Sequence, residues 1–268
     1  MRYVIDHDFH IHTNLSPCAN DPWQTPENIL KFAKEHGLKT ISLADHYWDE
    51  AVPGVFHSWR SVTTDYIKQV LPLPQDDEVS FLFGCEADMD MNFTLGLSPE
   101  KYDLFDFMVI ATTHMHFVGE AISEADHASD QRRAELWCER FDKVLNTPLP
   151  FHKVGFAHMA TLFVGWPTED RYIRVLDMIP SADMAELFTK AAKLGAGIEI
   201  NQGDIKDAQR HPDSILRPLK IAKECGCKFY LGSDAHTQIG FTGMHDLFNW
   251  AIDALDLEEK DKFILQKG

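Results

Sequence analysis

Two histidines stand two residues apart near the start of the chain, in the segment Asp8-Phe9-His10-Ile11-His12-Thr13. An apolar, β-prone stretch precedes the pair and a stretch rich in Asn, Ser and Pro follows it, so the pair stands where a strand ends. Side chains two apart on a strand point to the same face, and both imidazoles can therefore reach one metal ion. The pair alone does not separate a metal site from ordinary partly buried histidines.

The elements that would position this pair alternate along the whole chain. After the first strand, short apolar runs predict six more, at residues 40–43, 79–83, 107–111, 153–156, 197–200 and 228–231. Apolar periodicity and capping residues predict helices near 25–37, 60–70, 129–146, 181–194, 213–225 and 243–254, with a kink or a late start at Pro218. Seven strands alternating with helices, without a linker, favour one domain over residues 1–268 that folds as a parallel α/β barrel.

Side chains that bind metals follow nearly every predicted strand. Beyond the first pair they are His46, Glu86, His114, His158, Asp234 and His236, whereas the sixth strand offers Asn201. In a parallel barrel the ends of all strands meet at one face, so these residues are expected to converge. Six imidazoles and two carboxylates are too many ligands for one ion. They suit two or three divalent ions such as Zn, Mn or Fe, and they do not suit Mg or Ca alone.

Composition restricts the partners. The 268 residues carry 42 acidic and 25 basic side chains, a formal net charge of −17, and no basic run interrupts the acidic balance. Such a surface repels nucleic acid, so a small molecule is the expected partner and a nucleic acid polymer is not. Five cysteines without framework spacing, no apolar leader and no long apolar span predict a cytoplasmic protein without a membrane partner. The oligomeric state is not predicted.

Taken in order, the motifs D-F-H-I-H-T, A-D-H, G-C-E, T-T-H, A-H and G-S-D-A-H resemble those of the PHP family (polymerase and histidinol phosphatase) over nearly the whole chain. The stretch Gly197-Ile-Glu-Ile-Asn201, and the run from His211-Pro212 to the last motif, are similar to the branch of stand-alone histidinol-phosphate phosphatases. The resemblance implies a distorted (β/α)7 barrel with a site for two or three metals.

The resemblance also implies a role for each position. His10, His12, Glu86 and Asp234 correspond to the ligands of one metal, and Glu86 would bridge to a second metal held by His114 and His158. His46 and His236 correspond to ligands of a third metal. The family often adds a histidine from the loop after the first motif, and here Cys18 takes that place, with Asp21 as an oxygen alternative. Within this set, Glu86, Asp234 and His236 are the expected catalytic residues.

Metal chemistry then predicts how the site works. Two ions lower the pKa of a water held between them, and the resulting hydroxide would attack the phosphorus of a bound ester. Asp45 is expected to orient a ligand imidazole. Lys206 and Arg210 are candidates for gripping the substrate phosphate, with a solvated surface pair as the alternative. His116 is expected to be a loop residue near the pocket. The loops 47–57, 87–98, 116–128 and 159–170 carry no motif that identifies a substrate.

The sequence therefore predicts a metal-dependent phosphomonoesterase that acts on a small phosphorylated metabolite, with histidinol phosphate the first substrate to test. Three alternatives stay open: a phosphodiesterase or nuclease, a C–N (amide) hydrolase on a related metal barrel, and a metal-binding module without catalysis. The acidic charge argues against polymer substrates. The intact set of metal-binding side chains argues against a module without catalysis.

Overall fold

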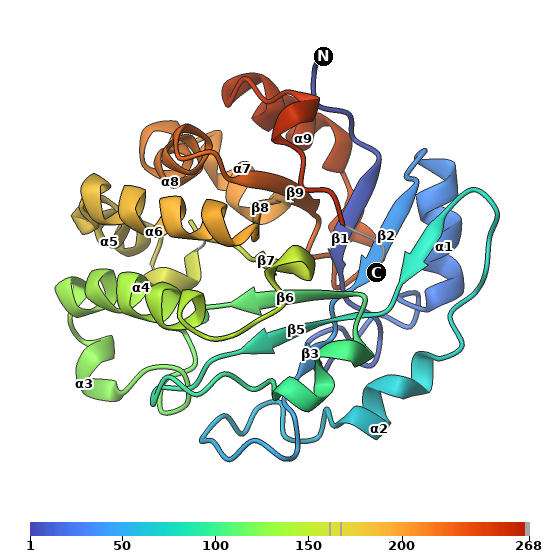
Figure 1. Ribbon diagram of the computed structural model, residues 1–268, viewed down its shortest axis with the longest axis horizontal. Coiled ribbons are helices and arrows are strands. Elements are labelled where there is room, and N and C mark those ends of the chain that lie inside the picture. The colour runs from blue at the N-terminus through green and yellow to red at the C-terminus, as the bar shows by residue number, and fades with distance from the viewer. Residues whose placement is uncertain (161, 167, 266–268) are drawn as a thin grey trace.

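In the described part of the chain, nine strands form the centre of the molecule and helices lie outside them (Figure 1). The computed structural model describes residues 1–160, 162–166 and 168–265. The strands are β1 His7–Ile11, β2 Thr40–Leu43, β3 His46–Tyr47, β4 Ser80–Leu82, β5 Gly84–Asp88, β6 Phe107–Ala111, β7 Val154–Phe156, β8 Gly197–Asn201 and β9 Lys228–Gly232. Each of the seven predicted strand regions thus contains a strand, and β3 and β5 are two further strands that the sequence analysis did not predict.

Nine α-helices lie between and after the strands in the described part of the chain. They are α1 Pro26–Glu35, α2 Thr64–Ile67, α3 Glu124–His127, α4 Asp130–Leu145, α5 Glu169–Met178, α6 Ser181–Leu194, α7 Gln202–Ala208, α8 Pro212–Glu224 and α9 Met244–Ala254. Short 3-10 helices include η1 Lys68–Val70, η2 Pro99–Leu104, η3 Phe151–Lys153, η4 Leu162–Val164, η5 Gln238–Phe241 and η6 Glu259–Asp261. Helix α8 begins at Pro212 and continues through Pro218, so the predicted late start is wrong.

All strand ladders are parallel, and they form two sheets with the orders β1-β2-β4 and β3-β5-β6-β7-β8-β9. The segment 40–47 supplies β2 to one sheet and β3 to the other, and the segment 80–88 supplies β4 and β5 in the same way. The end of β1 meets the end of β9 through a parallel bridge between Ile11 and Ala235. Parallel pairing is confirmed, whereas a closed (β/α)7 barrel stays a prediction.

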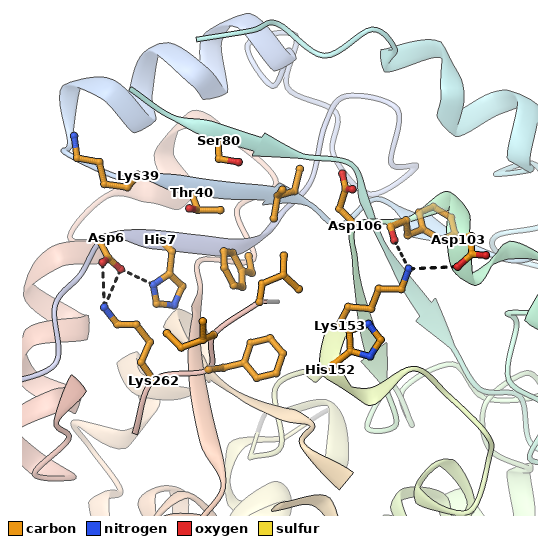
Figure 2. Close-up of a pocket in the computed structure, with 16 residues that line it drawn as sticks. Asp6, His7, Lys39, Thr40, Ser80, Asp103, Asp106, His152, Lys153 and Lys262 are labelled. Carbon is orange, nitrogen blue, oxygen red and sulfur yellow. Dashed lines mark hydrogen bonds and ion pairs between the residues drawn. The ribbon is translucent and has the colours of Figure 1, made fainter. Parts of the chain in front are cut away.

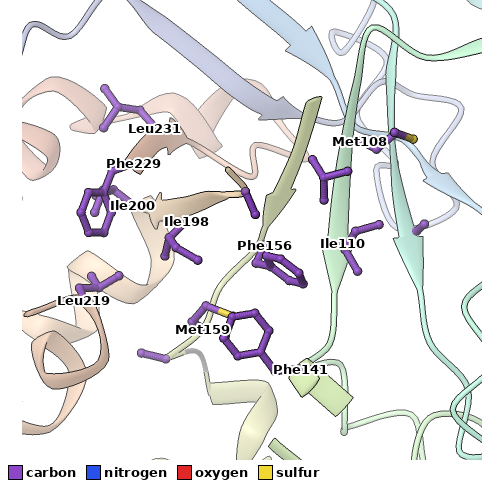
Figure 3. Packing of buried hydrophobic residues seen from close by; sticks show 14 of the residues in the cluster. Met108, Ile110, Phe141, Phe156, Met159, Ile198, Ile200, Leu219, Phe229 and Leu231 are labelled. Atoms are coloured by element: carbon purple, nitrogen blue, oxygen red, sulfur yellow. The ribbon is translucent and has the colours of Figure 1, made fainter. Parts of the chain in front are cut away.

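Burial of both strand faces explains why the strands are short apolar runs, because helices cover a parallel sheet on the outside. Figure 3 shows Ile110, Phe156 and Ile198 from neighbouring strands packed with Phe141 of α4. Leu219 of α8 lies in the same cluster beside β8 and β9. This packing fixes the strands relative to one another and therefore fixes the loops that follow them. Among the described helices, none has the length and apolar character that crossing a membrane requires.

Candidate metal centre

The candidate ligands converge on one cluster, and three of them, His10, His46 and Glu86, lie within strands β1, β3 and β5 instead of after a strand. Three groups of potential ligands have ligand atoms within 4.8 Å of one another: His12 with Cys18, His46 and His236; His10 with His12 and Asp234; and His10 with Glu86 and His158. The imidazoles of His10 and His12 and the carboxylate of Glu86 are buried, while Cys18 is exposed. The structure thus brings together every residue that the sequence nominated as a metal ligand, with His114 joining through Glu86.

Glu86 lies at the centre of the cluster, and its two oxygens face different imidazoles. Oε2 lies 3.1 Å from His46 Nδ1 and 3.6 Å from Nε2 of both His10 and His12. Oε1 lies 2.9 Å from His158 Nε2 and 3.7 Å from His114 Nε2. A carboxylate in this position can bridge two ions, one on each oxygen.

Asp234 closes the side of the cluster next to the first histidine pair. Its Oδ1 lies 3.2 Å from His12 Nε2 and 3.5 Å from His10 Nε2, and these two nitrogens are 3.1 Å apart. Burial raises the pKa of Asp234, but the neighbouring imidazoles, His10 first among them, lower it below its ordinary value. Burial likewise raises the pKa of Glu86, and His46 and His10 lower it well below its usual range. Both carboxylates are therefore ionised, as cation binding requires.

In four of the imidazoles Nε2 faces the cluster, and a hydrogen bond at the other ring nitrogen, Nδ1, orients the ring. The Nδ1 contacts are His10 with Glu199 Oε1 at 2.8 Å, His12 with Ser16 Oγ at 3.0 Å, His114 with Asp88 Oδ1 at 2.6 Å and His158 with Thr113 Oγ1 at 2.8 Å. The Ser16 hydroxyl donates to Asp45 and the Thr113 hydroxyl donates to His158 O, so each accepts from its imidazole. Nδ1 then carries the proton and Nε2 presents its lone pair to the cluster, the arrangement that metal ligation needs.

The sequence analysis expected Asp45 to orient a ligand imidazole, and Asp45 contacts the cluster through Ser16, which bonds His12. Its Oδ1 accepts from Ser16 Oγ and from Thr13 N, both at 2.7 Å, and its Oδ2 accepts from Thr13 Oγ1 at 2.7 Å. Asp45 thereby fixes the hydroxyl that holds His12.

Glu199 is a residue of the site that the sequence analysis missed. It lies in β8, is fully buried, and accepts from His10 Nδ1 through Oε1 and from His158 N through Oε2, both at 2.8 Å. A Cβ at Gly232 would overlap Glu199 Oε1, so the glycine at the end of β9 leaves room for this carboxylate. The available signal was alternation, because Gly197, Glu199 and Asn201 share one face of their strand. A buried acid on that face needs partners.

The third group surrounds Cys18. Its sulfur lies close to ligand atoms of His12, His46 and His236, the last with a side chain 31% exposed. His46 stacks on the Trp59 ring with centroids 3.9 Å apart and planes 7° apart, so its orientation is fixed from outside. The alternative ligand Asp21 accepts from Trp23 N and Gln238 N, both at 2.9 Å, and so shapes the surface loop instead.

Two buried arginines of α4 hold the loops that carry the ligands. The guanidinium of Arg140 donates to four backbone carbonyls: Thr112 at 2.7 Å, Asp90 at 3.1 Å, Ala121 at 2.9 Å and Met89 at 2.7 Å. Arg133 Nη1 donates to Met115 O at 3.1 Å and Val164 O at 2.7 Å. The sequence analysis did not assign them a role, although both lie on the α4 face that carries Trp137 and Phe141.

The predicted phosphate-binding cations lie on the surface. Lys206 is exposed on α7, and Arg210, which follows that helix, forms an ion pair with Asp207 at 2.5 Å. Their role in phosphate binding stays a prediction. His116 is half-buried next to the cluster, and its ring lies 5.4 Å from that of His114. It is outside the three ligand groups, as expected.

A cavity of about 640 Å³ lies at the opposite end of the strands (Figure 2). His7, Thr40 and Ser80, from the first residues of β1, β2 and β4, contribute to its lining. Among its charged groups, Lys262 pairs with Asp6 at 3.1 Å, and Lys153 donates to Tyr102 O at 2.8 Å. These groups do not converge on a common point, so we place the chemistry at the histidine and carboxylate cluster.

Comparison with known proteins agrees with this placement. No protein-family model matches the chain. It is similar to probable phosphatases from Caldicellulosiruptor saccharolyticus and Shewanella piezotolerans, each 24% identical, over 85% and 88% of this chain and 78% and 79% of those proteins. It also resembles the structure of histidinol phosphate phosphatase from Lactococcus lactis, complexed with Zn, L-histidinol and phosphate, with a TM-score of 0.63, 17% identity and 94% of both chains covered.

A putative histidinol phosphatase from Listeria monocytogenes gives a TM-score of 0.58 at 16% identity, over 88% of this chain and 97% of that one. At these identities the structural likeness establishes a shared fold. Together with the curated relatives and the ligand cluster, it confirms the predicted enzyme class at the level of a hydrolase of the phosphatase type with metal dependence.

Proposed function

We propose that the chain is a phosphomonoesterase of the PHP family that uses two or three divalent ions, Zn, Mn or Fe, to hydrolyse a small phosphorylated metabolite. The observation that carries the proposal is Glu86, whose two oxygens face two separate sets of imidazoles. The parallel strands and the meeting of β1 with β9 support a closed (β/α)7 barrel. Histidinol phosphate is the first substrate to test, because the solved relative from Lactococcus lactis was crystallised with L-histidinol and phosphate.

Metal ions bound here would supply an activated water and would offset the negative charge of the phosphate oxygens. The residues of the chain set the geometry for both tasks. Glu86 fixes the separation of the two sets of imidazoles, and the hydrogen bonds to Nδ1 keep each Nε2 aimed at the centre. Asp234 and His236, with side chains 21% and 31% exposed, are the most accessible of the imidazole and carboxylate ligands. The substrate phosphate therefore enters on their side of the cluster.

The charge of the chain favours a small substrate over a polymer. A net charge of −17 weakens association with a polyanion, whereas a single phosphate can reach a site lined with cations. A phosphodiesterase or nuclease and a C–N hydrolase are the alternatives, and both use similar clusters of metal ligands. We therefore expect faster turnover of monoesters than of diesters or DNA.

The deciding experiment measures phosphate release from a panel of phosphorylated metabolites, a nucleotide diester and single-stranded DNA. Chelation should abolish release, and Mn or Zn should restore it better than Mg, because imidazole ligands suit transition metals. Glu86→Gln should lose more turnover and more bound metal than any single histidine substitution, with the exposed Glu186→Gln as the matched control. Faster cleavage of DNA than of every monoester, or full restoration by Mg alone, contradicts the proposal.

A further inference from the structure

Asp88 lies on the strand that separates two of the candidate ligand histidines. Strand β5 lies between β3 and β6 in the larger sheet (Figure 1). His46 stands on β3 directly beside Glu86 of β5, and His114 follows β6. Asp88 comes two residues after Glu86 and therefore faces the same side of the sheet. Its carboxylate can reach an imidazole on either side of its own strand.

The two oxygens of Asp88 are used unequally. The side chain is fully buried, and Oδ1 accepts from His114 Nδ1 at 2.6 Å. Oδ2 lies 3.4 Å from His46 Nδ1, and among the described residues it has no hydrogen bond of ordinary geometry. Burial raises the pKa of Asp88, but His114 and then His46 lower it, to about 2, so the group is an anion. A buried anionic oxygen without a donor is costly, and pairing with His114 alone does not explain it.

The nearest donor for this oxygen, His46 Nδ1, has a second acceptor within reach. Glu86 Oε2 lies 3.1 Å from it. With two carboxylates facing Nδ1, this nitrogen carries the ring proton, and Nε2 is left for the group with Cys18 and His236. The stacked ring of Trp59 holds the imidazole plane, so Nδ1 stays between the two carboxylates.

These two acceptors differ once the cluster holds cations. Glu86 Oε2 also lies 3.6 Å from Nε2 of His10 and of His12, so it is the oxygen that would share an ion with them. When it binds a cation, it no longer accepts from His46, because the cation repels the proton on Nδ1. Asp88 Oδ2 has no competing donor among the described contacts and can take that proton over.

We propose that Asp88 is a positioning residue that lets the two ions sharing Glu86 and the third ion near Cys18 be bound at the same time. It orients His114 for one of the paired ions through Oδ1 and His46 for the third ion through Oδ2. Without it, the paired ions and the proton of His46 would compete for Glu86 Oε2. The inference rests on the two or three ions of the proposed function, and it concerns their binding instead of turnover.

The test titrates the metal-free protein with Co²⁺. The charge-transfer absorption from the Cys18 thiolate to cobalt reports the third ion, and the total of bound cobalt reports all of them. Asp88→Asn keeps one oxygen, which the 2.6 Å contact holds at His114, so the amide NH2 faces His46 Nδ1. We expect the third ion to need about 10-fold to 100-fold more free Co²⁺, and the paired ions to keep their affinity.

Two further variants complete the series. Asp88→Leu removes both acceptors, so the ion held by His114 should weaken together with the third ion. Asp183→Asn on the exposed face of α6 makes the same chemical change as Asp88→Asn away from the cluster, and it should leave every step of the titration unchanged.

The third ion binding at the same free Co²⁺ in Asp88→Asn and in the parent overturns the inference. Loss of a paired ion from Asp88→Asn with an unchanged thiolate band also overturns it, because Asp88 would then be a ligand itself. A parent protein that binds no third cobalt overturns it as well. Absence of phosphate release from every monoester, with the cobalt titrations as expected, refutes the phosphatase function and leaves the role of Asp88 standing.

Discussion

Replacement of Glu199 by Gln tests whether the orientation of the imidazoles controls metal binding. The Glu199 oxygens accept from three donors, His10 Nδ1 and His158 N at 2.8 Å and Asn201 Nδ2 at 3.2 Å, and the carboxylate is fully buried. The glutamine amide has nearly the same shape but only one oxygen. If that oxygen faces His158 N, the amide NH2 faces His10 Nδ1 and drives the imidazole proton to Nε2, the atom that must bind metal. If the oxygen faces His10, two N–H groups oppose each other.

In either orientation of the glutamine amide, a buried hydrogen-bond contact of Glu199 is lost. An unsatisfied buried donor costs about 1–3 kcal/mol of unfolding free energy. Loss of a partner that orients a metal-binding histidine lowers metal affinity by about 10-fold to 100-fold. We therefore expect Glu199→Gln to fold, to have a lower Tm and to bind metal more weakly by one to two orders of magnitude.

The assay is competition for metal against a chelator of known affinity, combined with thermal unfolding of the metal-free protein. Glu186→Gln on the exposed face of α6 is the matched control, and it should leave the metal affinity and the Tm unchanged. A Glu199→Gln protein with the metal affinity and Tm of the parent would show that His10 is oriented by something other than this carboxylate, and the argument would be wrong.

Three further outcomes follow from contacts around the same cluster. Cys18 should resist iodoacetamide while metal is bound and should react once the metal is stripped, and the Cys18→Ser protein should bind up to one metal fewer per chain. Rapid alkylation of Cys18 in the metal-loaded protein contradicts its role as a ligand. Arg140→Met removes donors from four buried carbonyls and should cost at least about 3 kcal/mol of unfolding free energy, measured with urea; a loss within about 0.5 kcal/mol would contradict it. Burial raises the pKa of Asp8 to about 7, so its ionisation destabilises the metal-free fold progressively as pH rises from the unfolded value of 3.8. Asp8→Asn should therefore stabilise the metal-free protein, and by about 1 kcal/mol more at about pH 8 than at about pH 6 in urea unfolding; a gain that is equal at both pH values refutes this.

The ligand cluster was accessible from the sequence because parallel strands end at one face. His10, Glu86 and His158 are far apart in the chain, yet each follows or ends an apolar run, and that rule alone brought them together. Glu199 escaped because it lies within an apolar run, as an acid between two isoleucines, instead of after one. Alternation along β8 would have placed it on the same face as Asn201.

Other features depend on contacts that a sequence does not display. The Arg140 guanidinium donates to the carbonyls of Met89, Thr112 and Ala121. These carbonyls lie in three separate loops, and only the folded chain brings them together around one side chain. The division of residues 40–47 into β2 and β3 likewise depends on which neighbour each half pairs with. Local propensity carries no information about either.

The junction of β1 with β9 has a consequence for the lifetime of the protein. The hydrogen bonds that join the two strand ends include Asp234 N to His10 O at 2.7 Å and His12 N to Ala235 O at 3.2 Å. The same four residues include candidate metal ligands from both ends of the chain, so an ion bound to them would hold the first strand against the last. Free metal at about 100 times its dissociation constant adds about 2.7 kcal/mol to the stability of the folded state. Metal-starved copies would open first at this junction and be degraded by proteases, so metal supply would set the abundance of the enzyme as well as its activity.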